Sequence, residues 1–140
     1  MGKTKNKWGK ISIPPPDEIL FYREVVCKNS SDLIPNSKLI PTALNHNIKL
    51  IFYPASKNIS TSPSDGIIEL TSFEENNNPN TYALNRHLRN AFCHLNIIID
   101  GEMSLLRDSL KVFPGKKIQT TMTGKVKYTD LKDLIKSMIK

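Results

Sequence analysis

The clearest pattern of hydrophobic and polar positions lies between residues 79 and 95. Asn78 can cap the start of a helix, and Pro79 suits the first helical position. Apolar residues then recur at the i, i+4, i+7, i+8 and i+11 spacing of one helix face. These are Leu84, Leu88, Ala91, Phe92 and Leu95. The pattern predicts a central amphipathic helix over about residues 79–95.

Two more helices are predicted near the ends of the chain. Pro16 suits a first helical position, and the acidic Asp17 favours the positive end of the helix, which predicts a helix over about residues 16–28. The last stretch, "YTDLKDLIKSMIK", can be capped by Thr129 and has one apolar face. That face consists of Leu131, Leu134, Ile135 and Met138.

Two segments in the middle of the chain are ambiguous. Pro41 can open a helix that Pro54 ends, because Leu44, Ile48, Ile51 and Phe52 fall on one helical face. The stretch "KLIFY" inside it also fits a short buried strand. The later stretch "IIELTSF" fits the edge of a helix or a short strand.

The segment between the central and last helices has a different character. "NIIIDGEMSLL" contains an Asp-Gly turn signal, and "KVFPGKKIQTTMTGKVKY" has two more glycine-bearing turns with short alternating stretches. This predicts a small antiparallel hairpin. The expected fold class is therefore mainly α, a helical bundle with a small β-hairpin between the central helix and the C-terminal helix.

The length of 140 residues suits a single domain, residues 1–140, with a flexible basic arm over residues 1–13. A formal net charge of +7 favours polyanionic partners, RNA or DNA first. The alternative is an ordinary basic protein that binds no nucleic acid. No apolar run approaches the ~20 residues that cross a bilayer, so we expect no membrane association and a cytoplasmic location.

The two cysteines, Cys27 and Cys93, form no CxxC pair. This argues against a zinc ribbon and against a disulfide-dense secreted fold. Two reduced thiols are the simplest interpretation, and one disulfide between them is the alternative. We expect no metal site and no cofactor, because acidic clusters with metal-ligand spacing and glycine-rich phosphate loops are both missing from the sequence.

Polar residues of the central helix suggest chemistry on phosphate. On a helical wheel Arg86, His87, Asn90 and His94 share the polar side, whereas Arg89 lies roughly 140° from His94. Histidine can transfer a proton at neutral pH, and arginine binds phosphate with a planar fork. These residue types suit metal-independent RNA cleavage. Arg89 and His94 diverge on one helix, so they can cooperate if the helix ends near His94 or if two copies face each other in a symmetric dimer.

The stretch "LRNAFCHLN" resembles the signature of the HEPN superfamily of small α-helical proteins. Arg89, Asn90 and His94 occupy its arginine, polar and histidine positions. The resemblance implies a ribonuclease that works as a homodimer, often a toxin or phage-defence component with an antitoxin or nucleotidyltransferase partner. Cys93 and Leu95 depart from the small residues that many relatives have beside the histidine, which puts catalytic competence in question.

Three hypotheses follow. The first is a HEPN-type metal-independent endoribonuclease, in which His94 transfers the proton, Arg89 stabilises the phosphate, Asn90 orients and Arg86 adds an RNA contact. The second is a catalytically inactive HEPN-like module that binds RNA or a protein. The third is an unrelated basic helical adaptor with solvated arginine and histidine. We expect His46 and His87 to be surface or turn residues, and Cys93 to be a packed or half-exposed thiol.

Overall fold

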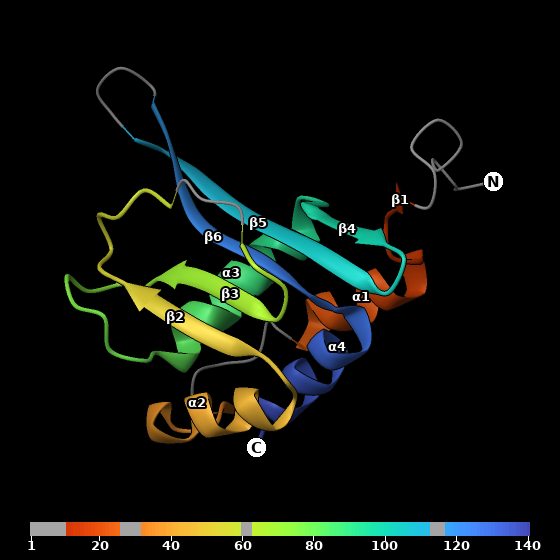
Figure 1. Ribbon diagram of the computed structural model, residues 1–140, viewed down its shortest axis with the longest axis horizontal. Coiled ribbons are helices and arrows are strands. Elements are labelled where there is room, and N and C mark those ends of the chain that lie inside the picture. Colours follow the sequence, from red (N-terminus) through yellow and green to blue (C-terminus); the bar gives the residue numbers. More distant parts are fainter. Residues whose placement is uncertain (1–10, 26–31, 60–62, 113–116) are drawn as a thin grey trace.

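The computed structural model describes residues 11–25, 32–59, 63–112 and 117–140. These residues form a six-stranded mixed sheet with four helices (Figure 1). The protein is therefore an α/β protein in its described part. The expectation of a mainly α, HEPN-like helical bundle is wrong.

The sheet has the strand order β1-β4-β5-β6-β3-β2. Its strands are β1 (Ile11–Ser12), β2 (Lys49–Tyr53), β3 (Ile67–Thr71), β4 (Ile97–Asp100), β5 (Met103–Val112) and β6 (Lys117–Lys127). β2 and β3 pair in parallel, and all other neighbours pair antiparallel. β5 and β6 continue to pair beyond the ends of β3 and β4, so residues 109–112 and 117–120 form a two-stranded extension, the β5–β6 ribbon.

The helices are α1 (Pro16–Val25), α2 (Asn36–Asn45), α3 (Thr81–Cys93) and α4 (Tyr128–Ser137). In Figure 1, α3 lies behind the sheet, and α2 and α4 lie along its lower end. On β5 the buried residues Ser104, Leu106 and Asp108 alternate with the more accessible Leu105 and Arg107. One face of the sheet is therefore covered by helices, and the other, here called the open face, is not.

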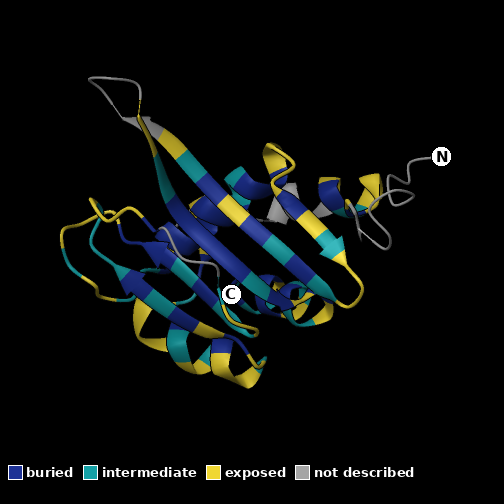
Figure 2. Cartoon of the chain, turned by 45° about the horizontal axis from the view of Figure 1, so that its top comes forward, coloured by how far each residue is buried: buried dark blue, intermediate teal, exposed yellow. Residues whose placement is uncertain are grey.

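The hydrophobic core lies between the sheet and the helices, where Figure 2 shows the buried residues concentrated. The apolar face predicted for the C-terminal helix is confirmed, because its four residues are all buried. The predicted stripe of the central helix is confirmed for its first four members, which are fully buried: Leu84, Leu88, Ala91 and Phe92. The fifth, Leu95, is 49% exposed.

Leu95 is exposed because α3 ends two residues earlier than the periodic pattern suggests. The amide of Asn96 donates to the carbonyl of Ala91 at 2.8 Å, and the amide of Leu95 donates to that of Phe92 at 3.3 Å. This is a Schellman arrangement, with Leu95 in the left-handed conformation at φ 55°. Glycine is the usual residue at this position, because a Cβ atom raises the energy of the left-handed backbone conformation. The turn directs the chain out of the core and into β4.

The middle of the chain also differs from the expected helix. Pro41 lies inside α2, which starts at Asn36, and residues 49–53 form strand β2, as the alternative interpretation of "KLIFY" proposed. The burial of this strand alternates with a period of two residues, with Leu50 and Phe52 buried. "IIELT" is likewise a strand, β3. The helical spacing of Leu44, Ile48, Ile51 and Phe52 was coincidental.

The expected small hairpin is much larger than predicted. It consists of β4, β5 and β6, and the last two have 10 and 11 residues. Several of its buried positions are polar, namely Ser104, Asp108 and Thr121. These residues interrupt the alternation of apolar and polar residues by which strands are identified.

The predicted basic arm, residues 1–13, lies mostly outside the described residues. Within the described part, Ile11 and Ser12 pair with Asp100 and Ile99 of β4 and form the edge strand β1. None of the helices in the described ranges has the length and apolar character needed to span a bilayer.

The start of α3 provides a test of the local structure. The side chain of Asn80, not of the expected Asn78, caps the helix by accepting a hydrogen bond from the amide of Ala83 at 3.0 Å. We expect Asn80→Ala to lower the free energy of unfolding by about 1 kcal/mol, measured by urea denaturation. Asn78→Ala is the matched control and should change it by less than about 0.5 kcal/mol. Equal losses in the two variants would contradict this assignment of the cap.

Candidate functional site

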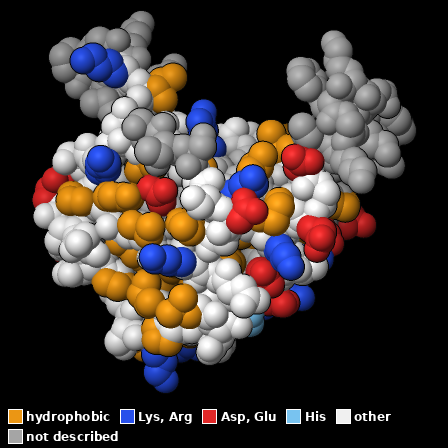
Figure 3. Space-filling view, viewed as in Figure 1, with side chains coloured by type: hydrophobic (Ala, Val, Ile, Leu, Met, Phe, Trp, Pro, Cys, Tyr) orange, Lys and Arg blue, Asp and Glu red, His pale blue; other side chains and the backbone are white. Residues whose placement is uncertain are grey.

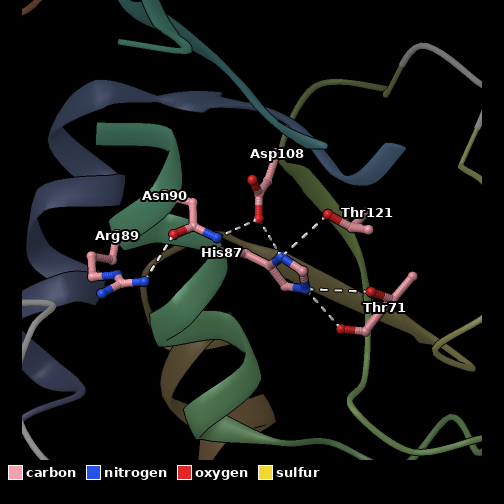
Figure 4. Close-up of polar contacts among 6 residues, drawn as sticks. All are labelled: Thr71, His87, Arg89, Asn90, Asp108 and Thr121. Carbon is pink, nitrogen blue, oxygen red and sulfur yellow. Dashed lines mark hydrogen bonds and ion pairs between the residues drawn. The ribbon is translucent and has the colours of Figure 1, made fainter. Parts of the chain in front are cut away.

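A network of polar side chains is buried between α3 and the sheet, with His87 at its centre (Figure 4). Its Nδ1 lies 2.8 Å from Oδ2 of Asp108 on β5, and its Nε2 lies 3.0 Å from the backbone carbonyl of Thr71 on β3. The hydroxyl of Thr121 lies at 3.5 Å from Nδ1. His87 and Asp108 are each only 5% exposed. The expectation that His87 is a surface or turn residue is therefore wrong.

The neighbours of the ring define the chemistry of His87. Nδ1 faces a carboxylate oxygen and donates to it, whereas Nε2 lies near both the carbonyl of Thr71 and, at 3.4 Å, its hydroxyl. His87 and Asp108 are thus joined by a buried hydrogen bond to a carboxylate. Both ring nitrogens are engaged inside the protein, where a substrate does not reach them. We infer that His87 positions α3 on the sheet and does not act as a general base.

Arg89 and Asn90 are attached to this network from its half-buried side. Asn90 donates from Nδ2 to Oδ2 of Asp108 at 3.1 Å, and its Oδ1 accepts from Nη2 of Arg89 at 3.1 Å. The Nε of Arg89 is buried without a hydrogen-bond partner among the described residues. The structure therefore brings together two of the residues predicted as catalytic.

The other predicted site residues lie elsewhere on α3. His94 is the exposed C-cap residue of the helix, and no hydrogen bond joins its ring to Arg89 or Asn90. Arg86 is exposed, donates to the hydroxyl of Tyr82 at 3.4 Å, and lies 5.9 Å from the ring centre of Phe73. One copy of the chain thus unites Arg89 and Asn90 but does not add His94 or Arg86 to them.

The open face carries a second candidate site, a groove across β4, β5 and β6 with a volume of about 560 Å³. Figure 3 shows apolar side chains on this side of the molecule, with basic and acidic side chains among them. Residues that line the groove include Leu95, Ile98, Leu105, Arg107, Thr123 and Lys125. In the sheet register Leu105 pairs with Lys125, and Arg107 pairs with Thr123, so these four side chains adjoin one another.

Of the two basic side chains that line the groove, one is paired with an acidic residue and the other is not. Lys125 forms a salt bridge of 3.1 Å with Asp65. The side chain of Arg107 is exposed and forms no salt bridge with any other described residue. Glu69, opposite Thr123 on β3, accepts a hydrogen bond of 2.9 Å from Tyr53. This hydrogen bond, together with burial and the charge of Glu69, raises the pKa of Tyr53. Arg107 is thus the free positive charge of the groove.

Basic residues also continue along β6. The sequence from Ser109 to Thr129 contains five lysines and no acidic residue. Lys117 at the β5–β6 ribbon and Lys127 at the opposite end of β6 are both exposed. A strand rises about 3.4 Å per residue, so these two charges lie on the order of 30 Å apart. β6 therefore carries an exposed positive charge near each of its two ends.

Sequence reasoning missed His87, Asp108 and all of the groove residues. His87 and Asp108 are 21 residues apart, and no local pattern indicates that they meet. The groove had no local signal either, because its side chains come from three strands that the sequence did not separate. Their proximity follows from the register of the sheet.

The cysteines and possible metal ligands add no further site. Cys93 is exposed with a free thiol, whereas Cys27 lies outside the described residues. Within the described ranges, no three His, Cys, Asp or Glu side chains lie close enough together to hold a metal ion.

The comparisons with known proteins add no assignment. Neither protein-family models, nor curated proteins, nor solved structures give a match to this chain.

Proposed function

We propose that the protein binds RNA through the lysines of β6. The observation that carries the proposal is the charge of residues 109–129, which include five lysines and no acidic residue. This stretch contains the whole of the 11-residue strand β6, and the lysines near both ends of that strand are exposed. Phosphate contacts from lysine and arginine dominate nonspecific affinity for nucleic acids. The net charge of +7 favours the same class of partner at long range.

Single-stranded RNA fits this surface better than a duplex does. Exposed apolar side chains, Leu110 of β5 and Ile118 of β6, lie on the same strands as basic residues. Unpaired bases can contact such side chains. A duplex would hide the faces of its bases from these residues.

The test is a titration of a short fluorescent single-stranded RNA, followed by anisotropy between about 50 and 200 mM salt. Lys117→Gln combined with Lys127→Gln should weaken binding and lower the slope of log K against log salt by about 1.4, because each lost phosphate contact contributes about 0.7 for a single strand. A competing DNA strand of the same sequence tests the preference for RNA.

The matched control carries the same loss of charge on the helices. Lys38 of α2 and Lys136 of α4 are both exposed, so Lys38→Gln with Lys136→Gln changes net charge equally. The control should keep the wild-type slope. Equal slopes for both double variants would attribute binding to net charge alone and would refute the proposed surface.

RNA cleavage is a second candidate, favoured by one observation: Arg89 and Asn90 are hydrogen-bonded to each other on the half-buried side of α3, one helical turn before the exposed His94. In this proposal two copies of the chain would meet at that end of α3 and combine Arg89 of one with His94 of the other. The RNA from the binding assay is therefore also run on a denaturing gel. Cleavage by the wild type that His94→Ala abolishes supports this candidate, and intact RNA throughout leaves binding without catalysis.

A further inference from the structure

The groove on the open face combines three features that the RNA proposal does not use: an aliphatic wall, a free cation and a buried hydroxyl without a partner. We propose that this groove binds a small carboxylate with an aliphatic body, whose carboxyl group is held by Arg107 and Thr123. The inference is independent of RNA binding, because the lysines tested above, Lys117 and Lys127, do not line the groove.

Thr123 is the strongest indication of a ligand. The residue is 5% exposed, and its Oγ1 has no hydrogen-bond partner among the described residues. A buried hydroxyl normally has a hydrogen-bond partner, because without one it loses its hydrogen bonds to water and gains none in return. The strand register places Thr123 between Glu69 and Arg107, and the residue lines the groove. Its hydroxyl can donate to a ligand oxygen there.

Arg107 supplies the complementary charge. It faces Thr123 across the β5–β6 pair and forms no salt bridge with any described residue. A guanidinium presents two parallel N–H donors that match the two oxygens of one carboxylate. Lys125 is already bound to Asp65, so the groove has one free positive charge for one anionic group.

The polar set favours a carboxylate over a phosphate. Phosphate sites are commonly built from several free backbone N–H groups at a helix start or a nest. Here the amide of Arg107 already donates to the carbonyl of Asn96 at 3.0 Å, and Thr123 lies within a paired strand. One guanidinium and one hydroxyl suffice for a carboxylate.

The walls favour an aliphatic body. The apolar lining consists of Ile59, Pro63, Leu95, Ile98, Leu105 and Leu106, with no aromatic ring among them. The volume of about 560 Å³ lies within the usual range of small-molecule sites. Leu95 lines the groove in the left-handed conformation at φ 55°, where glycine would be less strained. Such strain is commonly found at binding sites.

The test is a titration of the full chain with sodium octanoate, followed by amide NMR chemical shifts. We expect saturable shifts at Arg107, Thr123 and their strand neighbours. Octan-1-ol has the same chain without the charge and should bind at least about tenfold more weakly, because a hydrogen bond to a charged group is lost. Equal affinity for octanol, or shifts that are absent from the groove, would overturn the proposal.

Variants separate a ligand-binding role from a structural one. Arg107→Gln should weaken octanoate about tenfold or more, whereas Arg86→Gln, which removes an exposed arginine from α3 on the other side of the sheet, should not. Thr123→Val should weaken binding about threefold while thermal stability stays unchanged or rises, since a buried unpaired hydroxyl is removed. Thr123→Ser, which keeps the hydroxyl, should retain the affinity.

Two further results would decide the matter. If Arg107→Gln and Thr123→Val both keep the wild-type affinity while they stay folded, the carboxylate is not held as proposed. Lys117→Gln with Lys127→Gln should leave octanoate binding intact, so a failure of RNA binding and a failure of this proposal can be told apart.

Discussion

Asp108→Ala is expected to lower the free energy of unfolding by about 2–4 kcal/mol, because two donors lose a charged acceptor. The substitution removes the carboxylate that lies 2.8 Å from Nδ1 of His87 and leaves this buried ring nitrogen without its acceptor. It also removes the acceptor for Asn90 Nδ2. Urea denaturation at neutral pH, followed by far-UV circular dichroism, measures this loss.

An exposed ion pair of the protein serves as the control for this prediction. Lys125 and Asp65 lie at a similar distance, 3.1 Å, but the side chain of Asp65 is 72% exposed. Asp65→Ala should therefore cost no more than about 1 kcal/mol. Asp108→Asn, which keeps hydrogen-bonding capacity but loses the charge, should fall between the two. A loss for Asp108→Ala as small as that for Asp65→Ala would mean that the buried network does not hold α3 on the sheet.

Phe92→Ala is expected to produce a loss of similar size, about 3–5 kcal/mol. Phe92 is fully buried in the core cluster, where α3 packs against the sheet and the other helices. Truncation removes the apolar contacts of the ring and leaves a cavity, because close-packed neighbours relax only in part. Chemical denaturation should show a lower midpoint with an unchanged slope.

Phe73 provides a matched phenylalanine on the surface. It is 46% exposed and makes an edge-on ring contact with Tyr82 at 5.6 Å between centroids. Phe73→Ala should cost clearly less than Phe92→Ala, since the ring is already half exposed and its aromatic pair adds only about 0.5–1.5 kcal/mol. If Phe73→Ala destabilised the protein as much as Phe92→Ala, the position of the core would differ from that described here.

The helices could be predicted from the sequence to a useful extent. α3 and α4 have strong local signals, since their apolar residues repeat with helical spacing. The expected cap of the last helix was wrong, because Thr129 lies inside α4, whose N-cap residue is Lys127. The ends were less accurate, because the pattern continued through Leu95 while the Schellman turn stops the helix at Cys93. Local periodicity does not report where a chain turns.

The sheet could not be predicted in the same way, and the fold class was wrong as a result. β2 and β3 pair with each other over a separation of 18 residues, from Lys49 to Ile67, and no local pattern encodes such a pairing. In β5 and β6 the buried side is partly polar, with Ser104, Asp108 and Thr121 facing the helices. Strands of this kind look like loops when only their hydrophobicity is considered.

Only part of the candidate site could be predicted from the sequence, because the rest depends on contacts between distant elements. Arg89 and Asn90 are sequence neighbours, and the structure joins them by a hydrogen bond. The helical wheel placed His87 on the polar side of α3, and its polar partners from β3 and β5 make its burial possible. A buried polar residue depends on partners from other elements, and these cannot be identified until the tertiary structure is known.

Gly124 lies in β6, where one side of the strand contacts the core and the other borders the groove. A Cβ at this position would come within 2.9 Å of Cγ1 of Ile68 and 3.2 Å of Cδ1 of Leu106, both of which are buried. The residues before and after Gly124 in β6 are Thr123 and Lys125, whose side chains line the groove. Because Gly124 has no side chain, β6 can pack closely against these two core residues. A bulkier residue at position 68 would move β6 away from the core and displace the neighbouring groove residues. Substitutions in the core can therefore change the geometry of the groove on the open face.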